Sequence, residues 1–164
     1  MIFTLEIETL ARLVIDDARG RSLRIVTAES CTGGLVAGAL CAVAGASDVF
    51  ERGFVSYSNR AKQEQLGVTG DLIADLGAVS EPIARMMAEG ALENSHAHVS
   101  VSITGVAGPG GGTPLKPVGT VHFATSRANQ SVRHRMEQFD LTERWDIQIA
   151  AVQTALEMLH ERLK

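Results

Sequence analysis

Four polar side chains and two glycines directly follow a short apolar run near the start of the sequence. In the stretch IVTAESCTGG at 25–34 these residues are Glu29, Ser30, Cys31, Thr32, Gly33 and Gly34. Either the Ser30 hydroxyl or the Cys31 thiol could be the nucleophile of an acyl-transfer reaction. The same residues could instead be a capping serine and a buried cysteine at the turn between a strand and a helix. The stretch by itself leaves both interpretations open.

The base that each nucleophile requires helps to separate the two interpretations. A cysteine nucleophile usually uses a histidine, whereas a serine can use a lysine that burial keeps partly neutral. The five histidines lie in predicted strands, at strand edges or in the last helix, without a motif typical of a catalytic loop; they are His96, His98, His122, His134 and His160. Lysine is scarcer, with only Lys62, Lys116 and Lys164 in the sequence.

Lys62 directly follows the residues YSN at 57–59, at the end of a predicted strand. Ligand crevices of open α/β sheets form at the carboxyl ends of strands. If the strands that end at Ser30 and Ser58 are parallel neighbours, Ser30, Tyr57 and Lys62 converge on one crevice. An isolated lysine near a strand end can also be a solvated surface charge, so the pairing of Ser30 with Lys62 is a hypothesis at this point.

A glycine-rich segment, ITGVAGPGGGTPLKPVGTV, occupies residues 103–121. The Walker pattern GxxxxGK[ST] is absent from it, and no clear helix follows it as a dinucleotide-binding loop requires. Its glycines could let backbone N–H groups approach an anion, or the segment could be a flexible connection. The pairs His96 with His98 and His122 with His134 have no cluster of carboxylates or cysteines beside them, so we expect no metal site.

Periodic apolar residues predict the elements that position these groups. We predict helices over about 4–19, from 35 to about 43, from 59, and from a cap at Ser80 to about 93, with strands over 23–28, 53–58 and 99–104. The strand over 99–104 alternates apolar with small polar residues, which indicates one polar side. Two further strands, over 118–126 and 131–139, are predicted to form an antiparallel hairpin.

A final helix completes the predicted order. Asp140 and Glu143 resemble a capping box, and the expected buried stripe is Trp145, Ile149, Val152, Leu156 and Leu159. Helices alternate with strands early in the chain and a hairpin comes late. This order predicts an α/β fold with three α/β/α layers and a mixed sheet, in a single domain over 1–164.

Composition and charge exclude several classes of protein. Hydrophobic residues make up 45% and charged residues 21% of the chain, which excludes disordered and low-complexity classes. The net charge of −4, without a basic cluster, argues against a nucleic-acid partner. The apolar runs are too short to span a membrane, and acids stand at the start where a signal peptide has basic residues. We therefore expect a cytoplasmic protein without a membrane partner, whose Cys31 and Cys41 are reduced.

Four blocks, in this order, resemble the carboxy-terminal domain of the CinA family, the competence/damage-inducible proteins. They are TAESCTGG at 27–34, RGFVSYSNRAK at 52–62, GAVSEP at 77–82 and ITGVAGPGGGTPLKPVGTV at 103–121. Members that consist of this domain alone look like nicotinamide mononucleotide deamidases, which form nicotinate mononucleotide and ammonia in pyridine nucleotide salvage. The resemblance implies an amidohydrolase with an α/β/α fold and with neither metal nor cofactor.

The resemblance also implies roles for individual residues. Ser30 would be the nucleophile, Lys62 its base, and Tyr57 a group that orients or relays the proton. Backbone N–H groups of the turn from Cys31 to Gly34 would stabilise the oxyanion, and the segment 104–108 with Arg144 would hold the phosphate. The residues expected to bind the substrate are Glu29, Cys31, Thr32, Gly33, Gly34, Asn59, Thr104, Gly105, Ala107, Gly108 and Arg144. The sequence does not decide whether Glu29 sets the turn or touches the ribose.

Two other functions compete with this interpretation: a non-catalytic nucleotide-binding or regulatory module of the same family, and a serine–lysine amidase of another carboxamide. A complete set of Ser30, Tyr57 and Lys62 favours an enzyme, because a sensor has no need for an activated nucleophile. Apolar stripes on the first and last predicted helices exceed what one core needs. We therefore expect a homo-oligomer, either a dimer or a trimer.

Overall fold

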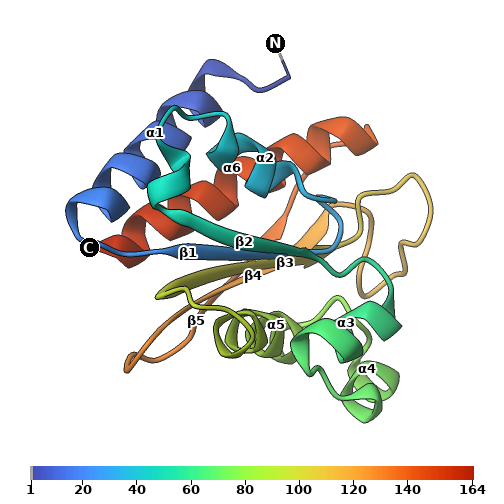
Figure 1. The fold of residues 1–164 in the computed structure, drawn as a ribbon. Helices are drawn as coiled ribbons and strands as arrows, with labels where there is room; N and C mark the ends of the chain where they lie inside the picture. Colours follow the sequence, from blue (N-terminus) through green and yellow to red (C-terminus); the bar gives the residue numbers. More distant parts are fainter. Residues whose placement is uncertain (1) are drawn as a thin grey trace.

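A five-stranded mixed sheet forms the middle layer of the protein (Figure 1). The computed structural model describes residues 2–164. In chain order the elements are α1 (Leu5–Gly20), β1 (Ile25–Glu29), α2 (Leu35–Cys41), η1 (Ala46–Asp48), β2 (Phe50–Val55), α3 (Asn59–Leu66), α4 (Gly70–Leu76), α5 (Glu81–Glu93), β3 (Val99–Gly105), β4 (Thr120–Arg127), β5 (Arg133–Gln138) and α6 (Arg144–Leu163).

The strand order brings the ends of three parallel strands to one edge of the sheet. The order is β2-β1-β3-β4-β5, with β1 parallel to both β2 and β3. Glu29, the last residue of β1, is in register with Val55 on β2 and Ile103 on β3. The antiparallel pairings of β4 with β3 and β5 confirm the predicted hairpin. The strands that lead to Ser30 and Ser58 are parallel neighbours, which is the condition under which Ser30, Tyr57 and Lys62 converge on one crevice.

Helices cover both faces of the sheet, which confirms the predicted three-layer α/β/α architecture. Figure 1 shows α1, α2 and α6 on one side and α3, α4 and α5 on the other. The larger apolar cluster lies under the first group and includes Ile7, Leu40 and Phe123, whereas a smaller cluster around Ile83 and Met87 lies under the second. Burying such side chains is the main stabilising contribution to a fold of this kind.

A row of buried hydroxyl groups joins β3 to α5 and to the loop that precedes it. Apolar side chains of β3 face the larger cluster, and the small polar residues between them face α5. Three hydroxyls donate to backbone carbonyl oxygens: Ser100 to Ala88 at 2.7 Å, Ser102 to Ala84 at 2.6 Å and Thr104 to Ala78 at 3.0 Å. The small polar side chains predicted on one face of this strand therefore form hydrogen bonds with α5 and its preceding loop rather than with water.

A close contact between two helices positions α3. A Cβ atom at Gly90 of α5 would collide with the backbone carbonyl oxygen of Leu66, the last residue of α3. Only glycine permits this approach, because it has no side chain. The helix that carries Lys62 is therefore pressed against α5.

Several predicted boundaries are wrong. The strand predicted over 53–58 lies at Phe50–Val55, and the short helix α4 was not predicted. Asp140 and Glu143 do not form a capping box: Glu143 itself is the N-cap of α6 and its side chain makes no capping hydrogen bond. Because the helix begins at Arg144, Trp145 lies in its first turn and is 48% exposed, while Ile147 is buried instead. Of the rest of the predicted stripe, Val152, Leu156 and Leu159 are buried and Ile149 is half-buried.

Candidate active site

Ser30 lies in a tight turn between β1 and α2. Its backbone N–H donates to the carbonyl oxygen of Ile103 at 2.9 Å, and its own carbonyl oxygen accepts from Gly33 N–H at 3.0 Å. Gly33 and Gly34 have φ angles of +56° and +99°, a left-handed conformation that other residues rarely adopt. The two glycines therefore allow the strand to turn directly into α2 and leave the Ser30 side chain at the carboxyl edge of the sheet.

The buried carboxylate of Glu29 stabilises this turn by accepting hydrogen bonds. It accepts from the Thr32 hydroxyl at 2.7 Å and from the backbone N–H groups of Val36 at 2.9 Å and Ala37 at 3.0 Å. A carboxylate at this place satisfies the free N–H groups at the start of α2. Glu29 and Thr32 thus bind each other and the helix, and the structure favours a structural role for Glu29 over contact with a ribose.

Lys62 points inward from the first turn of α3. Ser58 caps this helix by accepting from Ala61 N–H at 3.0 Å, and the Lys62 side chain is 1% exposed. Its Nζ donates to the Ser30 Oγ at 2.9 Å and to the carbonyl oxygens of Ser56 at 3.0 Å and Tyr57 at 3.1 Å. Lys62 is therefore no solvated surface charge but a buried amine in contact with Ser30.

Burial changes the protonation of Lys62. Loss of water around the ammonium lowers the pKa of Lys62 below its ordinary value, and the neighbouring Cys31 opposes this with a smaller influence. The three hydrogen-bond partners of Nζ are uncharged oxygens, which stabilise an ammonium less than a carboxylate does. A lysine in these surroundings can act as a base closer to neutral pH than a lysine in water.

Cys31 has the opposite character. Burial raises the pKa of the Cys31 thiol to about 12, so the thiolate is not populated near neutral pH. Its backbone carbonyl oxygen accepts from the side-chain Nε2 of Gln148 at 3.0 Å. Of the two nucleophiles that the sequence left open, only Ser30 therefore contacts a base.

Tyr57 contributes to the site in two ways. Its carbonyl oxygen accepts from Lys62, and the Ser30 Oγ lies 3.5 Å from the same oxygen. The phenol is 57% exposed and its oxygen accepts from Nη2 of Arg144 at 2.8 Å, while Nη1 of Arg144 donates to the Gly108 carbonyl oxygen. In this arrangement the phenol does not contact the Ser30 hydroxyl, so the structure differs from the expectation that it relays the proton.

A cleft of about 300 Å³ opens above Ser30. Ten of the expected residues line it. From the β1 and β2 side these are Ser30, Cys31, Tyr57, Asn59 and Lys62. From the glycine-rich segment and α6 they are Thr104, Gly105, Ala107, Gly108 and Arg144. The other four residues expected to contact the substrate, Glu29, Thr32, Gly33 and Gly34, lie in or beneath the turn and do not line the cleft.

The expected phosphate contacts are altered in one respect. The Thr104 hydroxyl donates to Ala78, so its proton is already used and is not free for an anion. Arg144 remains as a partly exposed cation in the wall, and none of the wall residues that the structure describes carries a carboxylate. An anion in the cleft would therefore meet Arg144 and backbone N–H groups without a nearby negative side chain.

Sequence reasoning missed part of the wall. Ala78 and Val79, which precede α5, line the cleft, as do Gly110 and Gly111 of the glycine-rich segment. The first pair belongs to the block GAVSEP at 77–82, but Ala78 and Val79 themselves have no side chain with obvious chemistry. Such residues contribute shape and backbone groups, which residue types alone do not reveal.

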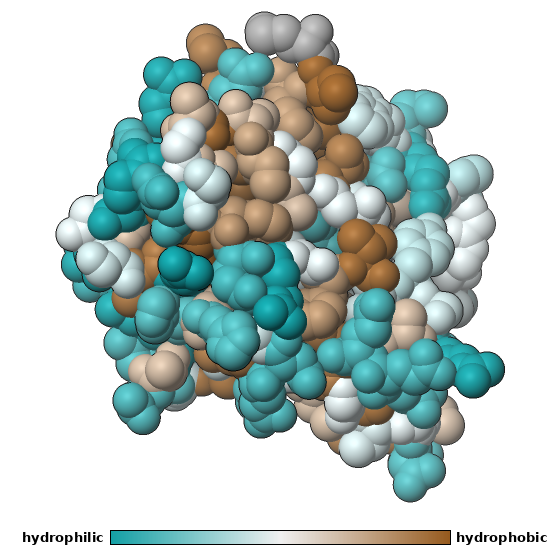
Figure 2. Space-filling model, viewed as in Figure 1, coloured by the Kyte–Doolittle hydropathy of each residue, from teal (hydrophilic) through white to brown (hydrophobic). Residues whose placement is uncertain are grey.

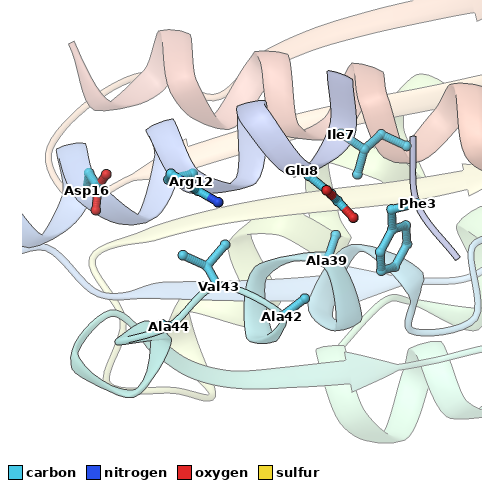
Figure 3. Close-up of a pocket in the computed structure, with 9 residues that line it drawn as sticks. All are labelled: Phe3, Ile7, Glu8, Arg12, Asp16, Ala39, Ala42, Val43 and Ala44. Atoms are coloured by element: carbon cyan, nitrogen blue, oxygen red, sulfur yellow. The ribbon is translucent and has the colours of Figure 1, made fainter. Parts of the chain in front are cut away.

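The largest hollow lies elsewhere, between α1 and α2. This groove has a volume of about 490 Å³ and is shown in Figure 3. Charged side chains of α1, namely Glu8, Arg12 and Asp16, line one side, and small or apolar residues that include Phe3 and Val43 line the other. Figure 2 shows apolar residues gathered over the same region of the surface. No hydroxyl, thiol or buried amine lines the groove among the residues described, so it offers no nucleophile.

Residues 2–164 contain neither a cluster of metal-ligating side chains nor a membrane-spanning helix. No three side chains of His, Cys, Asp or Glu gather in a way that could hold a metal ion, and none of the helices is long and apolar enough to cross a membrane. His122 Nδ1 and His134 Nε2 lie 2.9 Å apart on the β4–β5 hairpin. These two histidines are hydrogen-bonded to each other.

Comparisons with known proteins show the family to which the chain belongs. The family model for the CinA C-terminal domain matches residues 7–163. A CinA-like protein of Akkermansia muciniphila is 51% identical over 78% of this chain, and a putative competence-damage inducible protein of Caldicellulosiruptor saccharolyticus is 39% identical over 99% of it. The alignments cover 31% and 39% of these relatives, so the chain spans about a third of their length.

Solved structures with the same fold match over nearly their full length. The crystal structure of competence/damage inducible protein CihA from Agrobacterium tumefaciens is 50% identical, with a TM-score of 0.95 over 98% of this chain and 97% of the other. A competence-damaged protein (CinA) superfamily protein from Klebsiella pneumoniae is 35% identical, with a TM-score of 0.90 over 96% of this chain and 97% of the other.

Proposed function

Because the chain belongs to the CinA C-terminal domain family, we propose that it is a nicotinamide mononucleotide deamidase. It would hydrolyse the carboxamide of that nucleotide to nicotinate mononucleotide and ammonia, as a step of pyridine nucleotide salvage. The observation that carries this proposal is the buried contact of 2.9 Å between Lys62 Nζ and Ser30 Oγ at the floor of an open cleft.

The neutral form of Lys62 suits the role of a general base. A neutral amine has two N–H groups and one lone pair. The two N–H groups can donate to the carbonyl oxygens of Ser56 and Tyr57, which leaves the lone pair for the Ser30 hydroxyl proton. The three partners around Nζ thus hold the amine in the orientation that proton transfer requires.

The reaction would proceed in two stages. Lys62 takes the proton of Ser30 as the Ser30 oxygen attacks the carboxamide carbon, and a tetrahedral oxyanion forms. Lys62 then gives the proton to the leaving nitrogen, the C–N bond breaks and ammonia departs. Water, deprotonated by Lys62, attacks the acyl-enzyme and releases nicotinate mononucleotide with Ser30 restored.

Backbone N–H groups of the turn would stabilise the oxyanion. Gly33 N–H already donates to the Ser30 carbonyl oxygen, whereas Thr32 N–H has no acceptor in residues 2–164. Cys31, whose N–H is next to the nucleophile, is one of the residues that line the cleft. A preorganised donor of this kind typically contributes about 3 kcal/mol to transition-state stabilisation.

Arg144 would recognise the phosphate. Its guanidinium lies at the cleft wall between Tyr57 and Gly108, and it can exchange either partner for a phosphate oxygen. Gly110 and Gly111 line the same side without side chains, so their backbone can approach the anion closely. Asn59 lies at the start of α3 beside Lys62 and is placed to contact the rest of the nucleotide.

The activity can be tested directly. Purified protein is incubated without added metal with nicotinamide mononucleotide, nicotinamide riboside or nicotinamide, and ammonia is measured. Release from the mononucleotide alone supports the proposal. Release from a different carboxamide would make the protein another serine–lysine amidase, and binding of the mononucleotide without any release would make it a regulatory module.

Self-association is a separate proposal. Leu5 and Leu13 on α1 are 69% and 46% exposed, and Trp145 at the start of α6 is also exposed. We propose that such residues are covered in a homo-oligomer, because exposed large apolar side chains mark association surfaces when they gather. Light scattering at several protein concentrations would give the mass, and a monomer at every concentration would contradict the proposal.

A further inference from the structure

Gln148 lies one helical turn after Arg144 on α6, and the two side chains reach different segments of the site. Arg144 donates to the Tyr57 phenol oxygen and the Gly108 carbonyl oxygen, and Gln148 donates to the Cys31 carbonyl oxygen at 3.0 Å. Residues four positions apart share one face of a helix. The start of α6 therefore joins the nucleophile turn, the segment after β2 and the glycine-rich segment.

The contact of Gln148 completes the restraint of the nucleophile turn. The peptide between Ser30 and Cys31 is held by Gly33 N–H, which donates to the Ser30 carbonyl oxygen. The next peptide carries the Cys31 carbonyl oxygen, and Gln148 is the side chain that binds it. Among residues 2–164, no other side chain from outside the turn and α2 donates to a backbone oxygen of the turn.

A hydrogen bond to one end of a peptide group also affects the other end. Because the peptide is planar and trans, fixing the Cys31 carbonyl fixes the direction of the Thr32 N–H. The accepted hydrogen bond also polarises the peptide and makes that N–H a stronger donor. Gln148 thus acts on a backbone donor of the turn that has no acceptor of its own in the part of the chain described.

We propose that Gln148 is a positioning residue for the acyl transfer, an inference that rests on the function proposed above. Its side-chain amide holds the turn against α6, so that Ser30 Oγ keeps its contact with Lys62 Nζ and the turn amides keep their direction. Loss of this contact frees the turn to rotate. A misplacement of about 1 Å between reacting groups can cost about a hundredfold in rate.

The test compares three substitutions at this position with a matched control. Gln148→Met keeps the length of the side chain but removes the donor, and Gln148→Glu replaces the donor with an acceptor that repels the Cys31 carbonyl. Gln148→Lys restores a donor. The control is Gln153→Met on the same helix, where the amide donates to Glu157 at 3.2 Å, away from the cleft.

The expected result is a loss of kcat without a loss of binding. We expect Gln148→Met to lower kcat by about tenfold to a hundredfold with KM within about threefold, Gln148→Glu to lower kcat at least as much, and Gln148→Lys to recover most of it. Gln153→Met should match the unsubstituted protein. The pH of half-maximal kcat should stay unchanged, because Lys62 stays buried against the carbonyl oxygens of Ser56 and Tyr57, which do not belong to the turn. Unchanged kcat in the Gln148→Met variant, or an equal loss in Gln153→Met, overturns the inference.

A second readout separates this inference from the identity of the substrate. A fluorophosphonate probe reacts with an activated serine: the Ser30 oxygen bonds to phosphorus, fluoride leaves and Lys62 accepts the proton. If the protein labels at Ser30 but releases no ammonia from the mononucleotide, the proposed substrate is wrong, and slower labelling of Gln148→Met still supports positioning. Equal labelling rates contradict positioning even where the deamidase activity is present. Absence of both labelling and ammonia release overturns both proposals.

Discussion

The groove between α1 and α2 and the cleft above Ser30 differ in how far their polar side chains are exposed to water, a difference that their volumes do not reflect. The groove is the larger, at about 490 Å³ against about 300 Å³. Its charged side chains, Glu8, Arg12 and Asp16, lie on the outside of a helix, where water stabilises them. The cleft instead ends at a lysine that is almost fully buried and bonded to a hydroxyl. Catalytic polar groups are usually shielded from water, and of these two hollows only the cleft contains such a group.

The sharpest way to test this comparison is to remove the nucleophile. Ser30→Ala should lower kcat for ammonia release by about a thousandfold or more, because no other hydroxyl in residues 2–164 hydrogen-bonds to Lys62. Cys31→Ala, next to it in the same wall, is the matched control and should retain kcat within about threefold, since burial keeps the thiol protonated. The opposite pattern in an ammonia assay would assign the chemistry to Cys31.

Removing the base should have a nearly equal effect. Lys62→Met should lower kcat by about a hundredfold to ten-thousandfold, the usual contribution of a general base. Methionine fills a similar space, so circular dichroism should show an intact fold. The carbonyl oxygens of Ser56 and Tyr57 lose a buried donor, which we expect to lower the free energy of unfolding by about 1–3 kcal/mol. A rate equal to that of the unsubstituted protein would remove Lys62 from the mechanism.

Arg144 gives a test of substrate recognition rather than of chemistry. Arg144→Ala should raise KM for nicotinamide mononucleotide by about tenfold to a hundredfold, because a charge-assisted contact contributes about 1.5–3 kcal/mol. Any activity on the riboside, which has no phosphate, should change far less. A separate variant, Tyr57→Phe, removes one restraint on the guanidinium and should have a smaller effect on KM. If both KM values are unchanged, the phosphate lies elsewhere in the cleft.

The pH dependence should follow the protonation of Lys62. Below the pKa of the buried amine, kcat/KM should rise about tenfold for each pH unit, since only the neutral form is a base. Because burial lowers this pKa, the plateau should begin below 10.5, the ordinary value for a lysine. Between the two pKa values the unfolded chain binds more protons than the folded one, so stability should rise with pH in that window. Denaturant titrations on the Lys62→Met variant should lack this rise.

The groove should give the smallest effect. Arg12→Ala should leave kcat and KM within about twofold of the unsubstituted values and change the free energy of unfolding by at most about 0.5 kcal/mol, as is usual for a surface substitution. Steady-state kinetics and thermal melts measure both. A large loss of activity in this variant would mean that residues of the groove affect catalysis in the cleft. The contrast between the two regions would then have to be revised.

The sequence predicted the part of the site that depends on chain order. Apolar periodicity placed Ser30 and Lys62 after neighbouring strands, and the scarcity of lysine pointed to the pair. Periodicity could not show the direction of a flexible side chain, so the contact of the Tyr57 phenol with Arg144 was not foreseen. It also could not show that Glu29 turns toward α2, because a carboxylate at a strand end can face either a ligand or a helix.

The elements that were predicted poorly share a physical reason. The helix α4 has only seven residues, which is too short for a clear helical period. The predicted cap of α6 was Asp140, whereas the helix begins at Arg144. The prediction failed because Asp140 and Glu143 match the pattern of a capping box that they do not form in the structure. Ala78, Val79, Gly110 and Gly111 form walls through backbone and shape, and their residue types carry no chemical signal. The family resemblance drew attention to the segment 77–82, whereas glycine content drew attention to the segment 103–121.

The row of hydroxyls between β3 and α5 has a mechanical consequence for the cleft. Hydrogen bonds from three alternate residues of β3, two of them to α5 and one to the loop before it, resist sliding of the helix along the strand, because a shift of one residue would break all of them together. The wall at Ala78 and Val79 is tied to the last of these bonds and should behave as a stiff surface. Adjustment to a ligand is then left to the opposite side, where the glycines lie. Without a nucleotide in the cleft, hydrogen exchange should be slow along α5 and fast from 107 to 112.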